Sequence, residues 1–510
     1  MTPHRFRAPV FVLVTLPLLA AACTRLGPDY ERPELDVPGT FRELDAPAPA
    51  AEGESALGDL EWRNVFGDPA LQALIETAVT NNYDVRIAAE RVLEARAFLT
   101  IVRADLYPDV NAVGGGEFTR ASKNGPVALP PGVDKDQESA FVGADLAWEI
   151  DFWGRIERST EAARAELLAS EFARRAVAQS LVAAVAEAYY VLLELDEEIE
   201  ISRRTVESRQ RSERLVSLRL EHGIANKVEL RQAEGLVLQA AGIIPALEQR
   251  AVQVENQLRQ LIGANPGPVK RGLPLLEQAD PRWHDIPEGL PSELLARRPD
   301  VMIAEQSLVA ANARIGAAKA LLYPSIRLTG NGGVLSDDLS DLFKHDSQTW
   351  SIVPSATIPI FNAGRLRANV EVTESQQRQA ALAYLQTVQI AFQEVADALI
   401  AREKTSEVRD ILGRFEATLQ DQTRLSRNRY RGGVTSYLEV LDSERDYFDA
   451  ELSFARSVRD ELLSIVFLYR ALGGGWQATP AAEPVPPMEL PEPKSEPDLD
   501  AVPTADAATD

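Results

Sequence analysis

An internal duplication constrains the fold of this chain more than any other feature of its sequence. Four landmarks keep an offset of about 210 positions, in the pairs Gly154/Gly364, Gly223/Gly433, Glu229/Glu439 and Gly263/Gly473. Upstream, Tyr107-Pro108 recurs as Tyr323-Pro324 at an offset of about 216. Landmarks that recur in one order indicate a tandem structural unit. We therefore expect two copies of one unit, which consists of a helix, a β-hairpin, a long helix, a tight turn and a second long helix.

Within each copy, one segment alternates between apolar and polar residues with the period of two that is typical of a β-strand. In the first copy, Asp145 and Glu149 lie opposite an apolar face. In the second copy, Arg327 and Asn331 occupy the corresponding polar face. Strands with one apolar face and one polar face are typical of a membrane β-barrel, in which the polar face lines the lumen. These four side chains are therefore predicted to line a barrel lumen. A soluble sheet with one face packed on helices shows the same alternation and is the alternative.

The number of strands decides which assembly a barrel would need. Two hairpins supply four strands per chain, whereas known membrane barrels begin at about eight strands. Open sheet edges cannot face lipid, because their backbone N–H and C=O groups would be unsatisfied. A membrane barrel therefore requires a ring-shaped oligomer in which several copies pool their hairpins.

The helical segments carry a heptad repeat. After the turn at Gly223, one apolar seam recurs every seven positions, at Leu230, Val237, Ile244, Ala251 and Leu258. The partner helices, about 155–220 and 365–430, would each reach roughly 100 Å at about 1.5 Å per residue. This pattern predicts long antiparallel coiled coils. Pro245 lies inside the seam and is expected to bend its helix or leave a local break.

The duplication divides the chain into six parts. They are a signal peptide (1–22), a lipid-anchored extended segment (23–62), the first repeat (63–263), a proline-rich linker (264–291), the second repeat (292–476) and an acidic tail (477–510). The hairpins are expected at about 108–153 and 324–362, and the helix pairs at about 155–262 and 365–472. The tail has almost no large apolar residue and is expected to be disordered.

The start of the chain has the pattern of an export signal. Arg5 and Arg7 precede an apolar run that is too short to span a bilayer. The only cysteine, Cys23, follows small residues at the cleavage point. We predict that Cys23 is lipidated and anchors the mature chain to a membrane. General signal-peptidase cleavage, which would leave an ordinary thiol, is the alternative.

Composition excludes several classes of function. A formal net charge of −24 would repel phosphates, so no nucleic-acid partner is expected. One cysteine and four scattered histidines support neither a disulfide framework nor a histidine-based metal site. The sequence lacks a phosphate-binding loop, a dinucleotide fingerprint and a catalytic triad pattern. We therefore expect no cofactor, no metal and no enzyme activity, and any transport would be passive or powered by a partner.

The second helix–helix turn holds the residues best placed to form a narrow passage. Leu438 and Asp442 are four residues apart and share one helical face. When several copies of the chain surround one axis, the copies of each such residue form a ring around that axis. A ring of carboxylates attracts cations. The alternative is that Asp442 is a solvated acid near a helix start, stabilised by the helix dipole.

These motifs resemble those of the outer-membrane factor family, the TolC-like channels of tripartite efflux pumps, and most of all its lipoprotein branch. The segments that carry the resemblance are 27–30, 148–155, 298–301, 359–364, 394–399, 429–433 and 471–476. The resemblance implies a mainly α-helical, duplicated fold with membrane β-strands, in which a homotrimer forms a 12-stranded barrel in the outer membrane and a 12-helix barrel in the periplasm.

The resemblance also implies roles for single residues and for partners. Leu438 and Asp442 would line the periplasmic aperture, with Arg429 and Tyr430 in the contacts that keep it shut. The turns at Gly223 and Gly433 would dock a periplasmic adaptor, which links the channel to an inner-membrane pump. The expected function is a passive exit duct for drugs or small amphiphiles. A conduit for type I protein secretion and a non-conducting periplasmic spacer are the alternatives.

Overall fold

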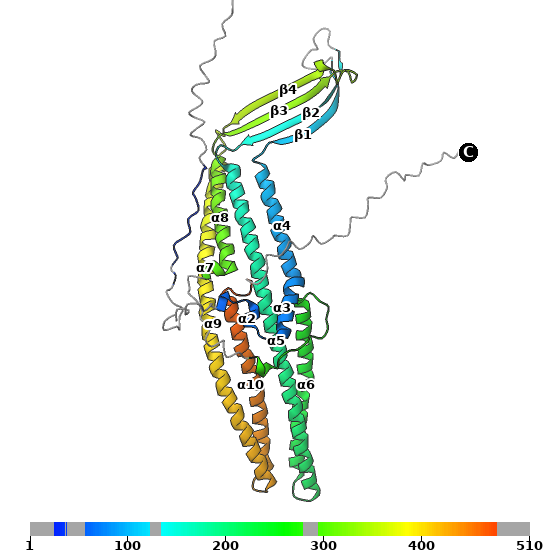
Figure 1. Ribbon diagram of the computed structural model, residues 1–510, viewed down its shortest axis with the longest axis vertical. Helices are drawn as coiled ribbons and strands as arrows, with labels where there is room; N and C mark the ends of the chain where they lie inside the picture. The colour runs from blue at the N-terminus through cyan, green and yellow to red at the C-terminus, as the bar shows by residue number, and fades with distance from the viewer. Residues whose placement is uncertain (1–24, 36, 38–56, 123–133, 279–293, 477–510) are drawn as a thin grey trace, which may run out of the picture.

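The computed structural model describes residues 25–35, 37, 57–122, 134–278 and 294–476. The predicted signal peptide, Cys23 and the acidic tail lie outside these residues. The molecule is long and narrow, with a four-stranded sheet at one end and two helix–helix turns at the other (Figure 1). The helical rod between them therefore separates the sheet from the turns by the length of the long helices.

The first copy contributes four of these helices, with the short η2 (Leu57–Asp59) and α2 (Trp62–Val65) before them. They are α3 (Pro69–Asn81), α4 (Tyr83–Ala104), α5 (Arg155–Glu221) and α6 (Lys227–Leu261). Asn82 divides α3 from α4, because its side-chain oxygen accepts hydrogen bonds from the backbone N–H groups of Asp84 and Val85. The stretch from Pro69 to Ala104 is thus two helices, and Asn82 is the cap that separates them.

The second copy repeats this arrangement. Its helices are α7 (Leu294–Arg297), α8 (Pro299–Ala320), α9 (Arg365–Arg431) and α10 (Tyr437–Ala471), with η3 (Leu275–Glu277) between the copies. Helices α5 and α9 each have 67 residues, and α6 and α10 each have 35. Gly154 and Gly364 precede the long helices with φ of +72° and +84°, a left-handed conformation that glycine adopts without a Cβ penalty.

Helix α6 is continuous through Pro245. Of the two outcomes expected at this residue, a bend or a local break, the structure excludes the break. Pro245 lies on the exposed side of α6, where water can solvate the carbonyl group that its missing N–H leaves free. The predicted seams face inward elsewhere in α6, since Ala233, Ala240 and Leu258 are buried.

The four strands form one antiparallel sheet in the order β1-β2-β3-β4. They are β1 (Asp109–Arg120), β2 (Asp136–Ile150), β3 (Ser325–Ser336) and β4 (Gln348–Thr357), with η6 (His345–Ser347) before β4. Strands β2 and β3 come from different copies, so the duplication joins its two hairpins edge to edge. Strands β1 and β4 are the free edges of the sheet.

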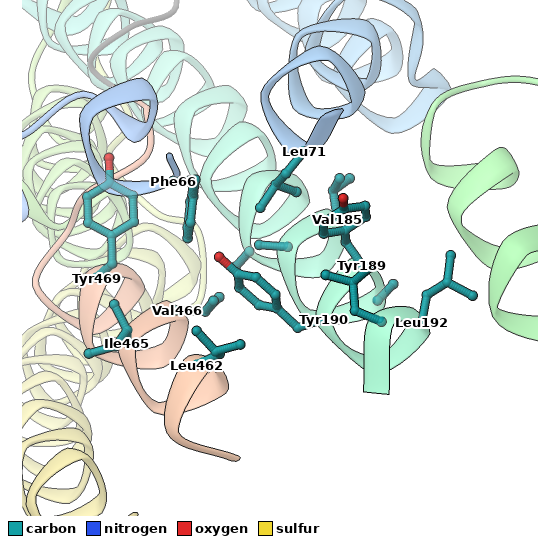
Figure 2. Packing of buried hydrophobic residues seen from close by; sticks show 14 of the residues in the cluster. Phe66, Leu71, Val185, Tyr189, Tyr190, Leu192, Leu462, Ile465, Val466 and Tyr469 are labelled. Carbon is teal, nitrogen blue, oxygen red and sulfur yellow. The ribbon is translucent and has the colours of Figure 1, made fainter. Parts of the chain in front are cut away.

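The main core lies where α3, α5 and α10 meet. Figure 2 shows Tyr190 of α5 facing Leu462 and Val466 of α10. Each fully buried side chain of this size contributes about 1.5–3 kcal/mol. Helix α5 includes a stretch apolar enough to cross a membrane by composition, yet 61% of that stretch is buried within the protein. Its apolar character is therefore explained by packing in this core.

Residues 25–35 lie against α5 and α8. Arg158, which is almost fully buried, donates hydrogen bonds to the carbonyl of Leu26 (3.1 Å) and to the carboxylate of Asp29 (2.8 Å). Arg32 forms a two-pronged ion pair with Glu305, both N–O distances being 2.7 Å. The N-terminal segment is thereby fixed beside the junction between the sheet and the helices.

Candidate functional site

The sheet brings together the four polar residues predicted on its strands. Asp145 is the register partner of Asn331, and Glu149 is the register partner of Arg327. Glu149 also accepts a hydrogen bond from Arg155 at 2.9 Å, and its other carboxylate oxygen lies 3.5 Å from Arg327. Because both pairs cross between the two copies, one polar strip runs over the middle of the sheet.

The opposite face of the sheet is apolar and exposed in the single chain. Trp350, Ile352, Val110 and Phe118 have exposed fractions of 77%, 63%, 61% and 78%. Residues two apart on a strand point to the same face, so these side chains lie opposite the polar strip. An exposed apolar face of this kind is unfavourable in water. It therefore indicates a surface that contacts a membrane or another molecule.

A close contact between glycines lies in the middle of the sheet. Gly143 of β2 is the register partner of Gly333 of β3. A Cβ on Gly333 would lie 2.3 Å from the carbonyl oxygen of Val142, and a Cβ on Gly143 would lie 2.6 Å from that of Gly332. The two strands therefore approach more closely here than side chains would permit.

The two helix–helix turns at the far end have the same geometry. Gly223 and Gly433 have φ of +74° and +73°, which explains why glycine recurs there. The residue after each glycine is apolar and strongly exposed, with values of 72% for Ile224 and 71% for Val434. Each turn thus presents an apolar tip that nothing in the described part of the chain covers.

The residues predicted for the aperture lie beside the second turn. Leu438 is 56% exposed, and the carboxylate of Asp442, four residues further along α10, is also about half exposed. Asp442 lies 3.5 Å from Arg445, and Arg429 lies 3.6 Å from Glu439. Within one chain, these two ion pairs are separate, and neither Arg429 nor Tyr430 bonds to Asp442.

Tyr430 joins the two helical hairpins. The guanidinium carbon of Arg219 lies over its ring at 4.2 Å from the centroid, and Arg219 donates hydrogen bonds to the carbonyls of Tyr430 (3.1 Å) and Arg431 (3.2 Å). The Tyr430 hydroxyl lies 3.5 Å from Glu229, the limit for a hydrogen bond. Burial raises the pKa of Tyr430, and Arg219 opposes that rise.

Sequence reasoning missed Arg219 and Arg445. Arg219 is the repeat equivalent of Arg429, so the offset of the duplication would have found it. Arg445 lies three residues after Asp442, a spacing that places two residues side by side on a helix. Among the residues that the structure describes, no group of three or more His, Cys, Asp or Glu is arranged to hold a metal ion.

Comparisons with known proteins match both copies. The family model for outer membrane efflux proteins matches residues 74–264 and 290–474. The chain is 38% identical over 449 residues to the probable efflux pump outer membrane protein TtgC of Pseudomonas putida, a match that covers 88% of this chain and 92% of TtgC. It is 36% identical over 461 residues to the probable outer membrane lipoprotein SilC of Salmonella typhimurium, covering 90% of this chain and 97% of SilC.

A solved structure shares the whole fold. The open state of the Neisseria gonorrhoeae outer membrane channel MtrE matches with a TM-score of 0.81 and 33% sequence identity. The match covers 89% of this chain and 99% of MtrE. The arrangement of one open sheet and long helical hairpins is therefore that of a known outer membrane channel.

Proposed function

The chain belongs to the outer membrane efflux protein family and is the outer-membrane channel component of a tripartite efflux system, and from this premise we propose how its copies build the duct. The prediction of family, location and channel function from sequence is confirmed. Three copies, each giving four strands, close a 12-stranded barrel. The observation that carries this proposal is the sheet itself, which has a lipid-like face and two bare edges.

The order of the helices supports the same closure. Helix α4 packs on α5, α5 on α8, and α8 on α9, so α4 and α9 are the outer helices of the row, as β1 and β4 are the outer strands. Both outer helices expose apolar residues, including Tyr83 (63%) and Ile101 (65%) on α4 and Leu382 (66%) on α9. Burial of these faces against the next copy removes them from water and closes the helical wall.

The polar strip then faces the lumen of the barrel. Asp145, Glu149, Arg327 and Asn331 would line a water-filled passage, while Trp350 and its apolar neighbours would face lipid. The ion pairs of Glu149 with Arg155 and Arg327 fix these side chains against the wall. A fixed, polar lining leaves a path open to small solutes.

The aperture is proposed at the opposite end of the duct. One Asp442 from each copy forms a ring of carboxylates, with Leu438 one turn away on the same face of α10. Gln232 occupies the corresponding position in the first copy, so each chain contributes one acid to the ring. Tyr430 and Arg219 hold the two hairpins together at this height, which keeps the passage narrow.

The turns at Gly223 and Gly433 are proposed as the docking site for a periplasmic adaptor, which connects the channel to an inner-membrane pump. Their exposed apolar tips, Ile224 and Val434, support this assignment because water-exposed apolar patches mark protein interaction sites. The two tips repeat within each chain, so a trimer presents six similar tips.

Cys23 is proposed as the site of lipidation. The first described residues lie beside the base of the sheet, where the backbone N–H of Leu26 donates to the carbonyl of Trp153 at 3.3 Å. Trp153 and Tyr323 pack with their ring centroids 4.8 Å apart at this junction, and such aromatic residues are enriched at membrane interfaces. An acyl chain two or three residues upstream would enter the same membrane as the barrel.

The proposed cargo is small and amphiphilic, and no catalytic step is assigned to the chain, because the family is one of transport components. The name of TtgC, an efflux pump protein, supports efflux over protein secretion. Conductance in planar bilayers tests the proposal: the purified protein should conduct, and Asp442→Asn should lower its preference for cations.

The matched control for this experiment is Asp421→Asn. Asp421 is exposed and pairs with Arg424 three residues further along α9, as Asp442 pairs with Arg445 on α10. The control should keep the cation preference of the parent. An absence of conductance in the parent would contradict the duct, and equal effects of the two substitutions would contradict the aperture.

A further inference from the structure

A basic groove lies between the two helical hairpins. It consists of two adjoining hollows of about 230 and 270 Å³, which share Ser208, Arg211 and Arg427 in their walls. We call their combined lining the arginine groove. Its cationic residues are Arg204, Arg209, Arg211, Arg427 and Arg431. In a chain with a net charge of −24, five arginines that line two adjoining hollows make this groove locally basic.

The acids of the groove do not cancel this charge. Only two glutamates, Glu444 and Glu451, share the lining. Glu444 is buried, and its Oε1 accepts hydrogen bonds from Arg427 at 2.8 Å and Ser212 at 3.1 Å, whereas its Oε2 has no hydrogen-bond partner in the described structure. Glu451 lies 3.6 Å from Arg204. Just outside the lining, Glu207 lies 4.0 Å from Arg211, and Glu197 lies 3.9 Å from Arg204. Arg209 and Arg431 are therefore the groove arginines that form no ion pair with a described residue, and they leave the groove with an excess of positive charge.

One nitrogen of a buried arginine in the groove lacks a hydrogen-bond partner. The side chain of Arg209 is almost fully buried, and its Nε is unpaired within the described structure, although its terminal nitrogens donate to the carbonyls of Leu236 and Glu444. Nearer the turn, the guanidinium of Arg431 forms no ion pair with any described residue and is exposed. Because the unpaired Nε of Arg209 lies in the same hollow as the unpaired Oε2 of Glu444, the exposed guanidinium of Arg431 is the group that indicates a site for an anion.

The chain itself contains an anionic segment within reach. Residues 477–510 include eight carboxylates and one lysine. They follow Trp476, just after α10 ends at Ala471, and the same helix lines the groove from Tyr437 to Glu451. The distance along α10 from Glu451 to Ala471 is about 30 Å, at about 1.5 Å per residue. A chain of 34 residues can span about 110 Å.

We propose that the acidic segment 477–510 binds in the arginine groove between the two helical hairpins. Its carboxylates match the planar guanidinium groups, which recognise carboxylates in two-pronged geometry. Its frequent prolines reduce the conformational entropy that binding must remove. The bound segment covers Arg211 and Arg431 and excludes other acidic ligands from the space between the hairpins. The proposal concerns the chain's own groove and does not depend on the duct being conductive.

The labelling rate of a cysteine in the groove tests this proposal. Ser212→Cys places a thiol in the first hollow, and its reaction with a negatively charged maleimide is measured in the full chain and in a chain ending at Trp476. A parent chain without this substitution gives the background from Cys23. The shortened chain should react about fivefold faster, because the bound segment shields the thiol and repels the reagent. High salt should raise the rate of the full chain toward that of the shortened one.

Two further variants test whether the protection of the thiol depends on charge or only on the presence of the segment. In the first, the eight acids of 477–510 are replaced by Asn and Gln, and in the second, Arg211→Gln is combined with Arg431→Gln. Both arginines are exposed, so their loss should leave the fold intact. Both variants should react as fast as the shortened chain, and an added peptide of sequence 477–510 should slow the shortened chain again. Thr418→Cys, exposed on α9 outside the groove, should react at one rate in every background.

Each of the following results either supports or contradicts the binding of segment 477–510 in the arginine groove. Equal rates for Ser212→Cys in the full and shortened chains would overturn the proposal. Protection by a segment whose acids have been neutralised would overturn its electrostatic basis. A salt-sensitive disulfide between Ser212→Cys and Ser495→Cys would place the segment in the groove directly, and its absence under oxidising conditions would count against the proposal.

Discussion

The guanidinium carbon of Arg219 lies 4.2 Å from the ring centroid of Tyr430, although 211 positions separate the two residues. Arg219 lies in the last turn of α5, the long helix of the first copy, and Tyr430 lies in the last turn of α9, the long helix of the second. The contact combines a cation–π interaction with hydrogen bonds to two backbone carbonyls. It fixes the spacing of the two hairpins at the end where the duct is proposed to be narrow.

Arg219→Gln should weaken this link by about 1–2 kcal/mol, since it removes the cation while keeping a polar side chain. The hairpins should then separate more readily, and the open conductance state in planar bilayers should be populated more often. Tyr430→Phe keeps the ring and loses only the long contact with Glu229, so its effect should be smaller. A larger effect of Tyr430→Phe than of Arg219→Gln would contradict this order.

Gly333→Val should prevent formation of the barrel. The new Cβ would lie 2.3 Å from the carbonyl oxygen of Val142 and 2.6 Å from the Cα of Gly143, both of which are backbone atoms that cannot rotate away. The trimer band in gels of unheated membrane samples should disappear. Gly332→Ala is the matched control, because a Cβ there meets only the Cβ of Trp350 at 3.9 Å. Loss of the trimer band in the control would refute the steric explanation.

Asp68→Ala should destabilise the helical core by about 3 kcal/mol. The Asp68 carboxylate is buried and accepts hydrogen bonds from the backbone N–H groups of Ala70 and Leu273 and from the side chains of Tyr189 and Gln278. It thereby joins α3, α5 and the connection between the two copies. Denaturant unfolding measures the loss, and Asp105→Ala, an exposed acid at the end of α4, should change stability little.

Asp68 also predicts a dependence on pH. Burial alone would raise the pKa of Asp68, but its hydrogen bonds outweigh burial and lower the pKa below its ordinary value. The stability from this carboxylate is therefore fully present above the ordinary pKa of an aspartate, about 3.9, and is lost as pH falls through the lowered value. Asp68→Asn should lose this acid dependence. An unchanged profile would show that another group causes it.

Glu194 should make the protein less stable as pH rises, which is opposite to the effect of Asp68. Burial and the neighbouring Glu198 raise the pKa of Glu194 to about 7, although Arg459 lies 3.3 Å away. The folded protein then holds a proton that the unfolded chain releases between about pH 4.5 and 7, so stability falls as pH rises through that window, by up to about 1.4 kcal/mol per pH unit. Glu194→Gln should flatten the profile of unfolding free energy against pH. An equally steep decline in the variant would remove Glu194 as its source.

The sequence was sufficient for the parts of the fold that rest on periodicity. The alternation around Asp145 and Asn331 predicted strands with one polar face, and the offset between Gly223 and Gly433 predicted two equivalent turns. The register that pairs Asp145 with Asn331 was not predictable, because it depends on how two distant hairpins meet. The sequence left open whether α6 bends or breaks at Pro245, since the outcome depends on which side of the helix faces water.

The candidate site was predicted in part. Leu438 and Asp442 could be placed on one helical face because four residues separate them. The offset of the duplication points to Arg219, but its contact with Tyr430 could not be predicted. Arg219 and Glu229 come from the other hairpin, and periodicity carries no information about contacts between hairpins. The arginine groove was missed for the same reason: its walls come from α5, α9 and α10.

The central claim is that a single chain leaves its sheet incomplete and that sister copies finish the barrel wall. Native mass spectrometry of the protein extracted from outer membranes in mild detergent tests it most directly. The complex should contain three chains, and the mass of each chain should be that of the 55.9 kDa precursor without its signal peptide. A stable monomer that remains soluble without detergent, with the edges of β1 and β4 protected from hydrogen exchange, would contradict it.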